Sequence, residues 1–126
     1  MKFDDLIGVP FRTHGRDTDG FDCYGLAIEV SRRYGNELPD FQYKHSNTDT
    51  VCKNYTSVIK ELGEKISKAE TPEESDLILF YDEKNRATHI GVALDKYRFI
   101  HCDNAGVRVL RFDYYGKKFE VFRWHK

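Results

Sequence analysis

Cys23 lies in a turn that leads directly into a predicted helix, and this position favours a reactive thiol. The preceding residues 15–20 read Gly-Arg-Asp-Thr-Asp-Gly and are typical of a loop. Apolar residues at helical spacing then predict a helix from about Cys23 to Tyr34, ended by Gly35. A thiol on the first helical turn lies near unpaired backbone N–H groups and the positive end of the helix dipole, which favour thiolate. A free cysteine is also often a small buried hydrophobic residue, so the thiol needs a base before it can be interpreted as a nucleophile.

Two histidines on neighbouring predicted strands are the best candidates for that base. His89 and His101 fall in the segments 88–94 and 98–102, which a short link connects. A three-residue turn would put both side chains on one face of the sheet, whereas a two-residue turn would put them on opposite faces. The sequence leaves this register open. The other histidines lie in expected loops or at the end of the sequence, where solvated roles are the better interpretation: His14, His45 and His125.

Small residues beside His89 favour a shared site. Gly91 and Ala93 lie on the same side of the predicted strand as His89, and small side chains would let the Cys23 helix approach that side. Cys23 would then be the nucleophile, His89 the base and His101 the group that orients the base. Backbone N–H groups at the helix start would hold the oxyanion. Two alternatives stay open: the histidines are satisfied polar core residues, or they belong to a zinc site with Cys23.

The order of the predicted elements indicates an α+β fold. After a short amphipathic segment at 2–7, a second helix is expected from Thr48 or Asp49 to about Ile66, with an apolar stripe that indicates packing against a core. Its Cys52 lies beside that stripe and is interpreted as a filler. Short links join the later strands into a meander, and the predicted fold is N-terminal helices packed on a five- to six-stranded antiparallel sheet in a single domain, 1–126. These strands are expected at 76–81, 88–94, 98–102, 107–112 and 119–124.

Composition limits the classes of function and partner. A formal net charge of −1 over 126 residues argues against nucleic acid and against an electrostatic hold on a membrane surface. No apolar run approaches the roughly 20 residues of a membrane span, and the first residues lack the apolar region of a signal peptide, so cytoplasmic synthesis without an export signal is expected. The three cysteines match no disulfide framework or zinc pattern, so reduced thiols, no metal and no cofactor are expected.

Five motifs, in their order and spacing, resemble the NlpC-type papain-like cysteine peptidases. They are Gly-Val-Pro-Phe (8–11), Gly-Phe-Asp-Cys-Tyr-Gly-Leu (20–26), Asp-Leu-Ile-Leu-Phe (76–80), Thr-His-Ile-Gly-Val-Ala-Leu (88–94) and Phe-Ile-His-Cys (99–102). The resemblance implies that Cys23 is the nucleophile, His89 the base and His101 the third catalytic residue. It also implies that Asp22, beside the nucleophile, binds a substrate amine, although Asp22 fits equally well as a helix cap.

The resemblance implies a substrate and a setting as well. The family cleaves amide bonds in the short peptides of peptidoglycan, in the cell wall or periplasm. Tyr24-Gly-Leu, with residues 36–41 downstream, resembles the branch found in tailed phages, which implies phage tail proteins as partners.

Phe11 departs from the family pattern. Many members have Tyr in a Tyr-x-Trp-Gly-Gly stretch where this chain has Phe11, so the phenol that the family places beside the nucleophile is missing there. Phe11 and Tyr24 are expected to shape the substrate site. Two further functions stay open: a non-catalytic assembly module of the same fold, and an acyltransferase or deamidase with the same three residues.

Overall fold

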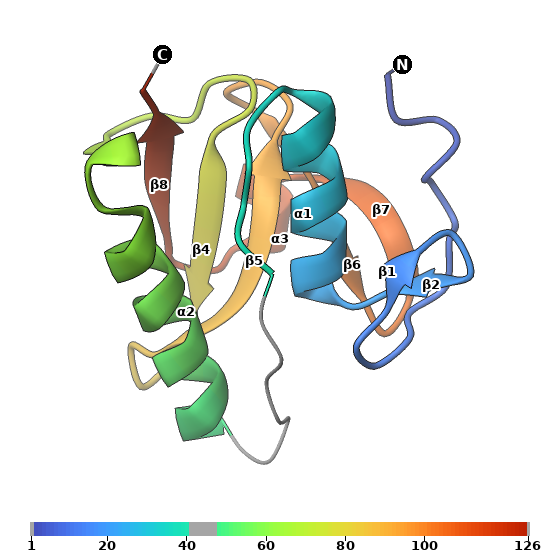
Figure 1. The fold of residues 1–126 in the computed structure, drawn as a ribbon, viewed down its shortest axis with the longest axis horizontal. Helices are drawn as coiled ribbons and strands as arrows, with labels where there is room; N and C mark the ends of the chain where they lie inside the picture. Colours follow the sequence, from blue (N-terminus) through green and yellow to red (C-terminus); the bar gives the residue numbers. More distant parts are fainter. Residues whose placement is uncertain (1, 41–47, 126) are drawn as a thin grey trace.

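Two helices cover one face of a six-stranded antiparallel sheet in the computed structural model, which describes residues 2–40 and 48–125, without side chains for 48–53 (Figure 1). The sheet and its covering helices confirm the predicted α+β class. The elements in chain order are β1 (Arg16–Asp17), β2 (Gly20–Phe21), α1 (Cys23–Arg33), α2 (Thr48–Leu62), a 3-10 helix (Gly63–Lys65), β3 (Ile66–Ala69), β4 (Leu77–Tyr81), β5 (Ala87–Ala93), β6 (Arg98–Asp103), β7 (Gly106–Arg111), α3 (Phe112–Tyr115) and β8 (Phe119–Trp124).

Helix α1 begins at Cys23, as the sequence predicts. The side chain of Asp22 caps it by accepting a hydrogen bond of 2.6 Å from the backbone N–H of Gly25. Gly25 itself is required by a close approach of two backbones. A Cβ at this position would lie 2.0 Å from the carbonyl oxygen of Gly15, far inside van der Waals contact. The loop before Cys23 is therefore packed directly onto the first turn of α1.

The sheet has the strand order β3-β8-β4-β5-β6-β7. Strands β4 to β7 form the predicted meander, but β8 pairs with β3 and β4 instead of β7, so the predicted last hairpin is wrong. The physical reason is α3, which ends at Gly116 in the left-handed region with φ 67°. Its rings pack on the sheet, with Phe112 and Phe119 4.8 Å apart, while the chain crosses from β7 to the free edge of β4.

The second helix is shorter than the sequence predicts. It ends at Leu62 because Gly63 adopts φ +50°, and Ile66 lies in β3 opposite Trp124 instead of continuing the helical stripe. Residues 2–8 form hydrogen-bonded turns instead of a helix. The predictions for His45 and for the Cys52 side chain lie outside the described residues. In the ranges that the structure does describe, no helix is both long and apolar enough to cross a membrane.

The two faces of the sheet have different cores. The front face carries α1 and α2 and buries mainly aliphatic side chains, including Val30, Ile90 and Val92. The back face carries α3 and is mainly aromatic, with Phe80 and Phe99 at its centre.

The expected contact between the Cys23 helix and the small side of β5 is wrong. Helix α1 packs on the side of Ile90 and Val92, whose bulk fills the space below a helix, whereas Ala93 belongs to the back face. A Cβ on Gly91 would lie 3.2 Å from the ring of Phe99. The small residues of β5 therefore make room for aromatic rings on the back face, and not for the helix.

Candidate active site

The two predicted histidines form a hydrogen-bonded pair. Nε2 of His89 lies 2.6 Å from Nδ1 of His101. The backbone N–H of Leu94 donates to the carbonyl of Arg98 at 2.9 Å, which closes a three-residue turn over residues 95–97. That turn gives the register in which both histidines share a face, and the structure confirms this interpretation of the sequence.

Aromatic side chains of the back face hold both imidazole rings. The ring of His89 lies 5.7 Å from that of Phe80, and the ring of His101 lies 5.1 Å from Phe99 and 5.4 Å from Tyr115, between ring centres. His101 has no exposed surface, whereas His89 is partly buried. Packing on several sides leaves the pair few alternative orientations.

Burial keeps both imidazoles neutral. It lowers the pKa of His89 to about 3, with the neighbouring His101 as a second cause, and it lowers the pKa of His101 to about 4. The carboxylate of Asp103 opposes the shift in both cases. In a neutral pair one ring nitrogen must donate and the other accept, so the tautomers of the two rings are linked.

The Cys23 thiol contacts a residue that the sequence interpretation missed. Its Sγ lies 2.7 Å from the hydroxyl of Tyr55, a side chain of α2 that is 4% exposed. The rings of Tyr55 and Tyr24 lie 6.3 Å apart. The available signals were a tyrosine in an otherwise mostly aliphatic stripe and the missing phenol at Phe11. Tyr55 therefore supplies, from another element, a phenol at the predicted nucleophile.

The thiol is neutral in this arrangement. Burial raises the pKa of Cys23 to about 11, and the carboxylate of Asp22 acts in the same direction. The Tyr55 hydroxyl and the backbone N–H of Ile90 act in the opposite direction by hydrogen bonding to the sulfur. The direction of the shift is opposite to that expected from the helix dipole, because desolvation of the buried thiolate outweighs the partial charge of the helix start.

Cys23 and the histidine pair meet at β5 from opposite sides of the sheet. Helix α1 packs against β5 and β6, and the Ile90 N–H that reaches the sulfur belongs to the residue after His89. Strands β5 and β6 pair at Val92 with Ile100 and at Ala93 with Phe99. His89 and His101 lie outside this paired stretch, on the side away from the turn. Among the described residues, the side-chain hydrogen-bond partner of the thiol is the Tyr55 hydroxyl and not His89, so the catalytic roles of the three residues stay a prediction.

The three predicted substrate-binding residues are largely occupied by the fold. Asp22 has no exposed surface, caps α1 and accepts a hydrogen bond of 2.8 Å from Arg16. Tyr24 is buried, and its hydroxyl donates to the carbonyl of Pro39. Phe11 is partly buried and packs against the front core. The structure shows the helix cap that Asp22 was expected to provide as one of two roles, and substrate binding stays a prediction for all three.

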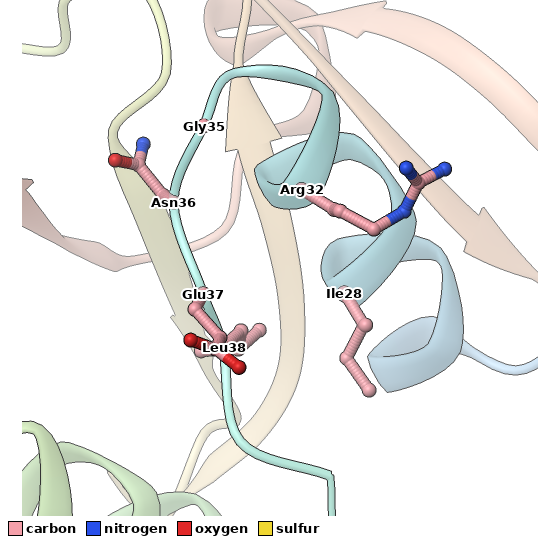
Figure 2. A pocket seen from close by; sticks show the side chains of 6 residues that line it. All are labelled: Ile28, Arg32, Gly35, Asn36, Glu37 and Leu38. Carbon is pink, nitrogen blue, oxygen red and sulfur yellow. The ribbon is translucent and has the colours of Figure 1, made fainter.

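A cavity of about 400 Å³ opens between α1 and the segment that follows it (Figure 2). It is lined by Ile28, Arg32, Gly35, Asn36, Glu37 and Leu38. Arg32 and Ile28 come from the second half of α1, and none of the predicted site residues lines the cavity. Within residues 2–40 and 54–125, no three His, Cys, Asp or Glu side chains are grouped so that they could hold a metal ion.

Comparison with known proteins identifies the family. Residues 8–123 match the sequence model of the NlpC/P60 family, and the chain belongs to it. The chain is 27% identical over 104 residues to the probable peptidoglycan endopeptidase LytE of Bacillus subtilis (strain 168), which covers 82% of this chain and 26% of LytE. The chain thus spans about a quarter of that relative. The fold is similar to the crystal structure of the NlpC/p60 domain of the peptidoglycan hydrolase SagA, with a TM-score of 0.62, 22% identity and coverage of 93% of this chain and 89% of that one.

Proposed function

We propose that this NlpC/P60 chain is a cysteine peptidase or amidase that cleaves an amide bond in peptidoglycan peptides, with Cys23, His89 and His101 as its catalytic residues. The observation that carries the proposal is the 2.6 Å bond between His89 and His101. His89 precedes Ile90, whose backbone N–H lowers the pKa of the Cys23 thiol. A nucleophile, a base and a group that orients the base are the parts of a thiol acyl-transfer site.

The proposed reaction proceeds through a thioester. His89 takes the proton of the Cys23 thiol as the sulfur attacks the carbonyl carbon of the substrate amide. The resulting imidazolium gives this proton to the amide nitrogen, so the C–N bond breaks and a free amine leaves. Water then attacks the thioester, with His89 as base, and releases the carboxylic acid and the thiol.

The front face supplies the electrostatic support for this reaction. Backbone N–H groups at the start of α1, including that of Cys23, stabilise the oxyanion of the tetrahedral intermediate. The Tyr55 hydroxyl, 2.7 Å from the sulfur, donates a hydrogen bond to the thiolate while it forms. Both contributions offset the desolvation that raises the pKa of the thiol.

Peptidoglycan as the substrate class is supported by the relatives. LytE is a probable peptidoglycan endopeptidase, and SagA is a peptidoglycan hydrolase. Action in the cell wall is part of this proposal. The comparisons give no support to a phage-tail setting, which stays a prediction from the sequence resemblance.

Purified peptidoglycan tests the proposal. We expect the wild-type chain to release soluble peptides with new amino termini, measured by mass spectrometry after labelling of free amines. Cys23→Ala should lower the rate by at least about a thousandfold, because it removes the sulfur that forms the proposed thioester. Cys102→Ser is the matched control, since this buried thiol donates to the Phe21 carbonyl at 3.1 Å and a hydroxyl can replace it.

Three outcomes of this assay separate the alternatives. Release that persists in Cys23→Ala would refute the thioester mechanism. A transferred product with an added amine acceptor would identify an acyltransferase. No release, together with a Cys23 that iodoacetamide labels no faster than Cys102, would identify a non-catalytic module.

A further inference from the structure

The second ring nitrogen of His101, Nε2, is fully buried. This nitrogen finds no hydrogen-bond partner within the part of the chain that the structure describes. The nearest charged atom recorded for it is Oδ2 of Asp103, at 4.0 Å. A buried nitrogen without a hydrogen bond destabilises the folded protein. The Asp103 carboxylate, 4.0 Å away, is therefore a candidate to stabilise a proton on this nitrogen.

Asp103 is held in place as a charged carboxylate. Its Oδ1 accepts from the backbone N–H of Ala105 at 2.9 Å, and its Oδ2 accepts from Arg108 at 2.7 Å. These bonds and the nearby His101 keep the pKa of Asp103 below its usual range, against the effect of burial. The carboxylate therefore stays ionised at neutral pH, at the turn that joins β6 to β7.

We propose that Asp103 is a positioning residue for catalysis, which holds the proton of His101 on Nε2 and thereby sets the tautomer of His89. With Nε2 protonated, Nδ1 of His101 accepts the hydrogen bond from Nε2–H of His89. Nδ1 of His89 is then unprotonated and free to take the proton of the Cys23 thiol. The use of this arrangement in catalysis rests on the function proposed above, whereas the tautomers do not.

Charges around the pair give Asp103 a second effect. Arg108 and Lys117 disfavour a protonated His101, and Asp103 favours it. The two imidazole rings also face each other, and both face the titratable phenol of Tyr115 in α3. When the thiol gives up its proton, the new imidazolium forms on His89, and the Asp103 carboxylate also raises the pKa of that ring and so stabilises its charged form.

Two substitutions separate this role from a structural one. Asp103→Asn keeps an oxygen for the Ala105 N–H and so preserves the turn, but it removes the charge. Arg108→Gln breaks the same ion pair and leaves the carboxylate facing His101. A structural role of the ion pair predicts the same change in both variants. The proposal instead predicts a change in Asp103→Asn that Arg108→Gln does not share, because Asp103 raises the pKa of His101 and Arg108 lowers it.

The pH dependence of Cys23 alkylation gives the first measurement. A less stable imidazolium weakens the thiolate, so Asp103→Asn should move the midpoint of iodoacetamide labelling up by about one pH unit and lower kcat by roughly tenfold. Arg108→Gln should leave the midpoint unchanged or move it down. Equal upward shifts in both variants, or no shift in Asp103→Asn, would overturn the proposal.

Nitrogen NMR of the imidazoles gives the second measurement, which needs no substrate and no activity. In the wild type at pH 7 we expect a protonated Nε2 and an unprotonated Nδ1 for both rings, and a mixture of tautomers for His101 in Asp103→Asn. Wild-type spectra with Nδ1 protonated in His101 would overturn the proposal. If the spectra agree but the wild type shows no activity and no labelling that depends on His89, the proposed function fails while the Asp103 link stands.

Discussion

The front and back faces of the sheet bury the two halves of the candidate site in different ways. On the front face, the Cys23 thiol lies among helices and contacts one phenol. On the back face, aromatic rings surround His89 and His101. Burial disfavours charge on both faces, but it raises the pKa of a thiol and lowers that of an imidazole. Each half is therefore neutral, and neither face alone favours the charged form.

This difference shows what the proposed reaction requires. A proton moves from sulfur to nitrogen only if the two new charges stabilise each other across β5, because each is costly by itself. His89 and His101 lie on β5 and β6 outside the paired stretch that contains Val92 and Ile100. Substitutions on one face at a time test this difference.

The largest effect is expected on the front face, at Gly25. In Gly25→Ala the new Cβ would meet the Gly15 carbonyl at 2.0 Å, so the loop or the helix must move. We expect the free energy of unfolding to fall by about 3 kcal/mol, more than the small gain that alanine gives a helix. Urea unfolding measures the change. Arg32→Ala, at an exposed site on the same helix, is the control, and a Gly25→Ala variant as stable as the wild type would contradict the close approach.

The next effect belongs to the back face and appears in acid. The pKa of each histidine is near 6.5 in the unfolded chain and lower in the folded one. As the pH falls below 6.5, only the unfolded state gains protons, so stability decreases by about 1.4 kcal/mol per pH unit for each histidine until the folded pKa is reached. Carboxylates in ion pairs lose their contribution to stability only at lower pH. The change in the free energy of unfolding between pH 6.5 and 4.5 is therefore expected to come from His89 and His101.

Unfolding at several pH values in that window provides the measurement. His101→Gln should reduce the decrease in stability between pH 6.5 and 4.5, even if it also lowers stability at pH 7. Tyr114→Gln, at a site that is 83% exposed, is the control and should leave the slope unchanged. A wild-type protein whose stability is constant over this window would show that the two imidazoles are not buried as neutral groups.

The smallest effect is expected from a single hydroxyl on the front face. Tyr55→Phe keeps the ring beside Tyr24 and removes the hydrogen bond to the Cys23 sulfur. The pKa of the thiol should rise, and the midpoint of iodoacetamide labelling should move up by about one pH unit. Tyr24→Phe is the matched control, since its hydroxyl bonds to Pro39 and not to the sulfur. Equal shifts in both variants would assign the effect to packing.

Local patterns in the sequence were enough to predict the elements that bear the site. The turn and helical spacing around Cys23 predicted the start of α1, and the apolar segments predicted β4 to β7 in their order. The pairing of His89 with His101 followed from one condition, a three-residue turn, which the structure meets. These features depend on residues close together in the sequence, where hydrogen bonding and side-chain alternation are decisive.

Features that depend on long-range packing could not be predicted in this way. The link before β8 has the length of a hairpin, and only the aromatic side chains of α3 lead it across the back face. Alternation along β5 separated His89 from Ile90 but did not show which side α1 would cover. Tyr55 shares its helical spacing with residues that serve only as core, so its contact with Cys23 appears only when α2 is placed in three dimensions.

The position of β8 between β3 and β4 has a consequence for folding during synthesis. Strand β3 pairs with β8, and β8 leaves the ribosome after every other element in the described part of the chain. Until then β3 has no strand to pair with, and α2, which precedes β3 in the chain, has no completed sheet to pack against. Contacts of such long sequence separation form slowly. We therefore expect the meander with the histidine pair to form first, and the phenol of Tyr55 to reach the thiol only when the sheet is complete.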